Sequence, residues 1–151
     1  MLKLLKNKGL KSSCISAGGD IVTGEAPPGK DSWEVQIVPY RDKSVKPITI
    51  RVTNAAVSTS GNTEQTIKIK NQRYSHILDP TSGLGLIHNN AATVIAPSGA
   101  QSDPLATALC VEGKDTLTII NKSPQFEAML FNRRDKLIEK IFSADFNKFV
   151  D

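Results

Sequence analysis

The side chains with the clearest chemical potential lie in residues 96–113, where a polar loop passes into an apolar helix. Asp103 precedes Pro104, and Thr107 follows Asp103 by four residues. Because residues four apart share one face of a helix, the carboxylate and the hydroxyl converge near the helix N-terminus. Two oxygen ligands at this spacing suit Mg²⁺, which proteins usually hold through one or two side chains while waters and phosphates complete the octahedron.

The same residues have an ordinary structural explanation. Proline fits the first helical position, so the sequence predicts a helix that begins at Pro104 and is capped by Asp103 or Ser102. Taken alone, a capping Asp before Pro with Thr in the first turns is more typical of a simple helix start than of a metal site. The local pattern therefore leaves both interpretations open.

Two other stretches have residues that suit a ligand site. Gly18 and Gly19 follow a predicted strand and precede Asp20, and such glycines let a ligand approach the backbone closely, although they also form ordinary turns. Residues 57–62 contain small hydroxyl side chains and end in a Gly-Asn pair. They offer donors to a ligand or simply form a small-residue strand.

A third stretch, residues 74–80, places His76 and Asp79 on either side of Ile77. An imidazole has a pKa near neutrality, so His76 could serve as a base or as a hydrogen-bond partner for a phosphate. A lone histidine is more often structural, and His88, which has no partner motif, is assigned that role.

The composition favours a single domain spanning residues 1–151, with 39% hydrophobic and 23% charged residues. The net charge is only +4 and aromatic residues make up 5%, so base-stacking platforms are scarce and no nucleic-acid partner is predicted.

Cys14 and Cys110 each have apolar neighbours, which predicts two buried free thiols. The apolar run in residues 1–9 is too short for a signal peptide or a membrane span, and without a lipid-anchor cysteine the chain as written is expected in the cytoplasm.

Hydrophobic periodicity predicts more strands than helices, and most strands pair with their sequence neighbours. The expected helices are residues 2–8, 104–113 and 115–122, the last capped by Asp115, and the expected strands are residues 13–17, 33–38, 48–52, 65–70, 91–96, 126–131 and 137–142. This pattern favours an α+β domain in which a mainly antiparallel sheet carries a few packed helices.

The motifs also occur in a characteristic order. Ala-Gly-Gly-Asp-Ile begins at Ala17, Ser-Thr-Ser-Gly-Asn at Ser58, Tyr-Ser-His-Ile-Leu-Asp-Pro at Tyr74, and Asp-Pro-Leu-Ala-Thr-Ala-Leu at Asp103. This series resembles the ApbE family, the FAD:protein FMN transferases. The resemblance covers residues 17–142 and corresponds to the carboxyl-terminal half of that family, so the chain is expected to be an ApbE-like domain truncated at its N-terminus.

The resemblance implies an activity and roles for named residues. Family members use Mg²⁺ to cleave FAD and attach FMN to a Thr or Ser hydroxyl of an acceptor flavoprotein, with release of AMP, and some hydrolyse FAD instead. By position, the metal ligands would be Asp103 and Thr107, and the candidate base would be His76. The segments that would contact the cofactor contain Gly18, Gly19, Asp20, Ser60, Gly61, Asn62, His76, Ile77 and Asp79.

Some family features are absent from this sequence. No counterpart exists of the family's Gly-Gly-Ile-Ala-Lys-Gly-like segment or of its exported lipoprotein leader, and Thr81 replaces the usual basic residue after Asp-Pro. Two functions of different class therefore stay open. The chain is a flavin transferase, or it is a non-catalytic truncated homologue that retains a weak flavin- or nucleotide-binding site.

Overall fold

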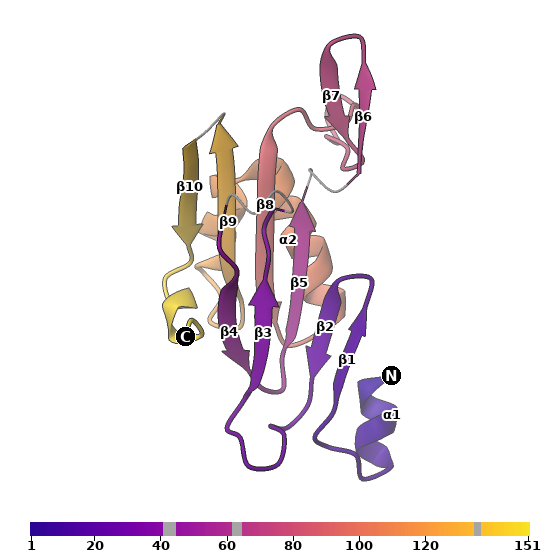
Figure 1. The fold of residues 1–151 in the computed structure, drawn as a ribbon, viewed down its shortest axis with the longest axis vertical. Helices are drawn as coiled ribbons and strands as arrows, with labels where there is room; N and C mark the ends of the chain where they lie inside the picture. The colour runs from indigo at the N-terminus through magenta and orange to yellow at the C-terminus, as the bar shows by residue number, and fades with distance from the viewer. Residues whose placement is uncertain (41–44, 62–64, 135–136) are drawn as a thin grey trace.

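The computed structural model describes residues 1–40, 45–61, 65–134 and 137–151. Within these ranges, six strands form one antiparallel sheet in the order β1-β2-β5-β8-β9-β10 (Figure 1). The strands are β1 (Cys14–Ala17), β2 (Asp20–Thr23), β5 (Ala56–Gly61), β8 (Asn89–Ala96), β9 (Glu127–Arg134) and β10 (Leu137–Phe142). The predicted α+β class with a mainly antiparallel sheet is confirmed.

Two layers cover the sheet. Helices α2 (Gly99–Glu112) and α3 (Lys114–Ile120) lie on one face, and the hairpin of β3 (Trp33–Ile37) and β4 (Ile48–Val52) lies on the other (Figure 1). A second hairpin, β6 (Thr66–Ile69) and β7 (Gln72–Ser75), extends beyond the end of the sheet, while helix α1 (Leu2–Asn7) and the short helix η1 (Phe146–Lys148) lie near the termini.

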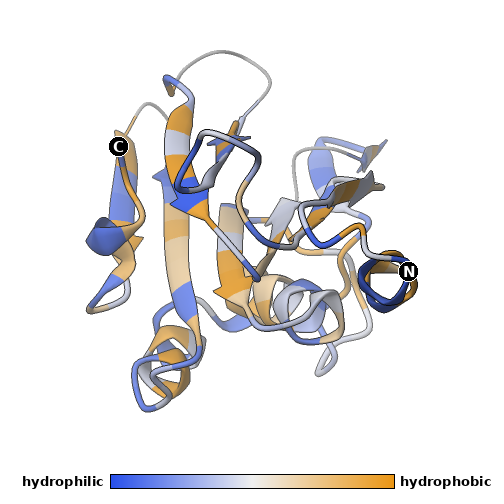
Figure 2. Ribbon diagram, turned by 90° about the horizontal axis from the view of Figure 1, so that it is seen from below, coloured by the Kyte–Doolittle hydropathy of each residue, from blue (hydrophilic) through white to orange (hydrophobic). Residues whose placement is uncertain are grey.

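The central strand β8 separates two hydrophobic cores because its residues alternate between them. Ala91 and Ile95 pack towards β3 and β4, whereas Ala92 and Val94 pack towards α2 and α3. Apart from its first residue, the strand is buried throughout, which explains its nearly continuous apolar sequence. Figure 2 shows the helices along one side of the sheet and apolar residues along its central strands.

Helix α2 begins earlier than the sequence predicts. Its first residue is Gly99, after Ser98 in an extended conformation, so Asp103 and Pro104 lie in the second turn and neither starts the helix. The prediction placed the helix start at Pro104. The first helical hydrogen bonds form earlier, because the carbonyl of Ser98 accepts from the amides of Gln101 and Ser102. Pro104 is exposed and gives up only one early hydrogen bond, to the carbonyl four residues before it.

Two other expectations are wrong. Asp115 does not cap α3, because the helix starts at Lys114 and Asp115 falls within its first turn, where its charge still complements the helix dipole. Cys14 is exposed because β1 is the edge strand of the sheet, whereas Cys110 is buried and free as predicted. Residues 41–44, in the loop between β3 and β4, lie outside the described residues. No helix in the described part of the chain is long and apolar enough to cross a membrane.

Candidate functional site

A cleft of about 620 Å³ lies where β5, helix α2, the β1–β2 turn and the base of the β6–β7 hairpin meet. Residues predicted from motifs far apart in the sequence share this cavity. The predicted site residues that line it are Gly18, Ser60, Gly61, His76, Ile77, Asp103 and Thr107.

Hydroxyl pairs hold helix α2 against β5 along one wall of the cleft. Ser60 Oγ lies 3.0 Å from Thr107 Oγ1, and Ser58 Oγ lies 2.7 Å from Ser102 Oγ in the buried interior. Cys110 Sγ also donates a hydrogen bond of 3.2 Å to the Ser60 carbonyl oxygen. These small side chains let the helix approach the strand closely, so the Thr107 hydroxyl is fixed at the surface of the cleft.

Asp103 lies one turn before Thr107 and is exposed to the same cleft. No hydrogen bond or ion pair to its carboxylate occurs within the described residues. These residues also hold no group of three or more His, Cys, Asp or Glu placed around a metal ion. An unpartnered carboxylate beside a hydroxyl fits Mg²⁺, which needs only one or two protein ligands when water and phosphate supply the others.

His76 follows β7 and faces the cleft from its hairpin side. Its Nδ1 lies 3.2 Å from the backbone oxygen of Gln65, and its backbone N–H donates to the same oxygen at 3.0 Å. Because a carbonyl oxygen only accepts hydrogen bonds, the neutral ring carries its proton on Nδ1. The lone pair on Nε2 is then available to take a proton from a ligand.

The paired glycines form the turn between β1 and β2. Gly18 and Gly19 have φ angles of 63° and 101°, which glycine adopts without strain. Gly18 lines the cleft, whereas Gly19 and Asp20 are not among its lining residues. Asn62 lies outside the described residues.

Asp79 lies in a different place from the other predicted residues. It lines a second cavity of about 500 Å³, together with Tyr74 and His88. Its carboxylate accepts hydrogen bonds from the Thr81 amide at 2.8 Å and the Ser82 hydroxyl at 2.9 Å. The pKa of Asp79 is lowered, mainly by the Thr81 amide and then by the Ser82 hydroxyl. Asp79 therefore organises its own loop in this structure.

Sequence reasoning missed Gln65 and Leu78, which also line the cleft, whereas Thr59, another lining residue, belongs to the predicted 57–62 stretch. Gln65 matters most because its carbonyl oxygen sets the orientation of His76. Pairing across the Lys70–Asn71 turn places residue 65 opposite residue 76, so recognising that turn would have identified this contact.

The fold and the cleft define an α+β protein in which a carboxylate, a hydroxyl pair and an imidazole face one polar cavity. A family model described as the ApbE family matches residues 1–130. The chain belongs to the ApbE family.

Named relatives agree with this assignment. The chain is 24% identical over 156 residues to the FAD:protein FMN transferase of Escherichia coli (strain K12), an alignment that covers 99% of this chain and 43% of that protein. The flavin transferase ApbE from Vibrio cholerae has a TM-score of 0.81 and 25% identity, covering 97% of this chain and 47% of its own. The Pseudomonas stutzeri flavinyl transferase ApbE, in its apo form, has a TM-score of 0.77 and 28% identity, and the match covers 97% of this chain and 46% of that protein. The chain thus spans less than half the length of these relatives.

Proposed function

We propose that this chain takes part in Mg²⁺-dependent cleavage of FAD, with transfer of FMN to a Thr or Ser hydroxyl of an acceptor flavoprotein. One observation carries the proposal: Asp103, Thr107 and His76, from two distant motifs, line one cleft. The names of the relatives support transfer of FMN from FAD to a protein, and the residues that line the cleft support the roles proposed below.

Each of the three residues has a role in this proposal. Asp103 and Thr107 would hold Mg²⁺, which would supply positive charge against the pyrophosphate of FAD. His76 accepts the proton of the acceptor hydroxyl at Nε2 while Gln65 holds Nδ1. The hydroxyl oxygen forms a bond to the phosphorus of the FMN half, the bond from that phosphorus to the bridging oxygen breaks, and AMP leaves with the bridging oxygen.

A flavin- or nucleotide-binding module without transfer is the second candidate. The observation that favours it is the small number of strong metal ligands, since the described residues hold no group of three or more His, Cys, Asp or Glu placed around one metal ion. Such a site would bind the phosphates of a flavin nucleotide weakly and would leave the pyrophosphate intact.

Release of AMP distinguishes the two functions. The chain is incubated with FAD and Mg²⁺, and AMP is quantified by chromatography for the natural sequence and for Asp103→Ala. Asp115→Ala, an exposed change on α3 away from the cleft, is the matched control. The transferase proposal expects AMP release that falls at least about tenfold in Asp103→Ala and is unchanged in the control. Flavin binding without AMP release supports the binding module. If the chain neither binds flavin nor releases AMP, both proposals are contradicted.

A further inference from the structure

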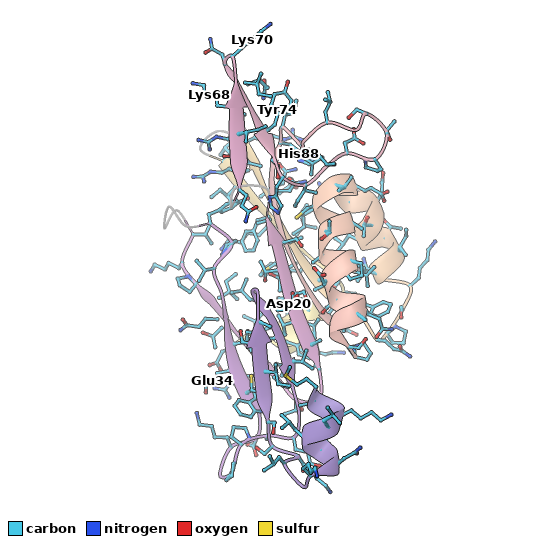
Figure 3. The ribbon with its side chains drawn as sticks, turned by 90° about the vertical axis from the view of Figure 1, so that its right-hand side faces the viewer. Asp20, Glu34, Lys68, Lys70, Tyr74 and His88 are labelled. Carbon is cyan, nitrogen blue, oxygen red and sulfur yellow. The ribbon has the colours of Figure 1, made fainter. Side chains whose placement is uncertain are left out.

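The β6–β7 hairpin extends beyond the sheet and continues directly from the cleft. Gln65 and His76, at its base, line the cleft, while Lys68, Lys70 and Tyr74 lie on the projecting part (Figure 3). Within the described residues β6 pairs only with β7, so its other edge is unpaired. Figure 1 shows β6 on the same side of the molecule as the β1–β2 hairpin, whose Gly18 also lines the cleft.

The free edge of β6 presents main-chain groups. The His76 amide donates a hydrogen bond to the Gln65 carbonyl. Because hydrogen-bonded and non-hydrogen-bonded pairs alternate along antiparallel strands, residues 65, 67 and 69 form the hydrogen-bonded pairs with β7. Thr66 and Lys68 therefore direct their N–H and C=O groups away from β7. An extended peptide could bind these groups as an added strand.

The hairpin is also strongly basic. Lys68 lies directly opposite Arg73, and Lys70 occupies the turn with a φ of 54°. Like charges opposite each other destabilise a strand pair. No described acidic residue forms an ion pair with any of these three side chains. An acidic partner would relieve this repulsion.

A lysine on an edge strand often serves only to prevent aggregation. Two isoleucines argue against that explanation here, because Ile67 and Ile69 are 63% and 54% exposed on the strand itself. By the alternation of a strand they belong to the face opposite Lys68, the face that contains Gln65 and His76. The strand therefore combines free main-chain groups, a cation on one face and apolar contacts on the other.

We propose that the free edge of β6 is the docking site for the acceptor polypeptide. An extended acceptor segment adds to β6 as a strand, an acidic side chain meets Lys68 and Arg73, and an apolar side chain covers Ile67. The segment then leads its Thr or Ser towards His76 at the hairpin base. This inference rests on the proposed function, because only a protein-modifying reaction needs a polypeptide at this cleft.

The test uses the isotope-labelled chain without FAD or Mg²⁺ and a short synthetic peptide with a central Thr and acidic residues at alternate positions. We expect the peptide to shift the β6 amide resonances and to slow exchange of the Thr66 and Lys68 amides. Lys68→Glu should weaken binding at least about tenfold, whereas Lys30→Glu, in an exposed loop, should not. The same peptide with N-methylated backbone amides should also bind at least about tenfold more weakly, because it cannot form the strand ladder.

Equal binding of the N-methylated peptide, or unprotected Thr66 and Lys68 amides, would mean that the peptide adheres by charge alone and would overturn the inference. Absence of binding would overturn it as well. Because no FAD is present, this result is independent of the AMP assay, and either proposal can fail while the other holds.

Discussion

The cleft and the second cavity share one short segment of chain and differ in how their carboxylates are used. His76, Ile77 and Leu78 line the cleft, and the next residues, Asp79 and Pro80, line the second cavity. In the cleft, the Asp103 carboxylate has no protein partner among the described residues. In the second cavity, the Asp79 carboxylate is occupied by its own loop.

This difference shows why a carboxylate in a motif is not by itself a ligand group. A carboxylate that accepts two local hydrogen bonds has fewer lone pairs and less freedom for a metal or a phosphate-bound cation. A carboxylate on an exposed helical turn beside a hydroxyl keeps its lone pairs and its freedom to bind a metal. The comparison supports our proposal that the cleft is the ligand site and that Asp79 orders its own loop, and four predictions test it.

The largest expected effect concerns metal affinity. Asp103→Ala should weaken Mn²⁺ binding, measured by electron paramagnetic resonance with Mn²⁺ as the probe for Mg²⁺, by at least about tenfold, or about 1.4 kcal/mol. Asp79→Ala is the matched control and should change the affinity less than about twofold, because its carboxylate bonds within its own loop. Equal losses in the two variants would show that the cavities act as one site.

A second prediction separates the cavities sterically. A Cβ at Gly85 would lie 2.3 Å from the Ser75 carbonyl oxygen, so Gly85→Ala forces the loop away from β7. We expect a loss of about 1 to 3 kcal/mol in the free energy of unfolding, measured with urea. Gly83→Ala has open space and carries only the strain of its φ of 70°, so it should cost about 1 to 2 kcal/mol and leave the loop against β7. Mn²⁺ affinity that falls in Gly85→Ala would show that the second cavity supports the first.

The two hydroxyl pairs between α2 and β5 provide a third test. Ser58→Ala leaves the Ser102 hydroxyl buried without its partner and should lower the free energy of unfolding by about 1 to 2 kcal/mol, with Mn²⁺ affinity unchanged. Ser60→Ala should cost less stability, because the cleft is open to water, but should weaken Mn²⁺ binding by freeing the Thr107 hydroxyl to bond the Asp103 carbonyl. The reverse pattern would contradict the role given to Thr107.

The smallest effect concerns pH. The pKa of Asp79 is lowered from its ordinary value of 3.8 by hydrogen bonds that need the charged carboxylate. The charged Asp79 carboxylate therefore orders the loop fully above pH 3.8. This ordering is lost as the pH falls through the lower pKa of Asp79 in the folded state. The protection factor of the Thr81 amide should fall in that range, while Asp79→Asn should remove this pH dependence of the protection. Persistent protection of Thr81 at pH values well below 3.8 would contradict the loop role of Asp79.

The sequence predicted most of the fold because its strands alternate cleanly. The β3–β4 pair and the closing β9–β10 hairpin follow directly from two-residue periodicity. The start of α2 could not be predicted from such a periodic pattern. A proline at the first helical position and a proline in the second turn give the same local signal, and only the extended conformation of Ser98 after β8 distinguishes them.

The site was predictable where its groups belong to motifs and unpredictable where they depend on tertiary contacts. The i, i+4 spacing correctly placed Asp103 and Thr107 on one wall of the cleft. The hydrogen bonds that occupy Asp79 come from backbone and hydroxyl groups whose geometry depends on the loop conformation. The contribution of Gln65 comes from its backbone carbonyl, which no side-chain motif reveals.

The thiol that joins α2 to β5 bears on the redox behaviour of the protein. Burial raises the pKa of Cys110 to about 12, so the sulfur stays protonated at neutral pH and very little of the reactive thiolate forms. Oxidants attack the thiolate, so this sulfur resists conversion to sulfenic acid, which would force the helix off the strand. Cys14, exposed on the edge strand, would react first.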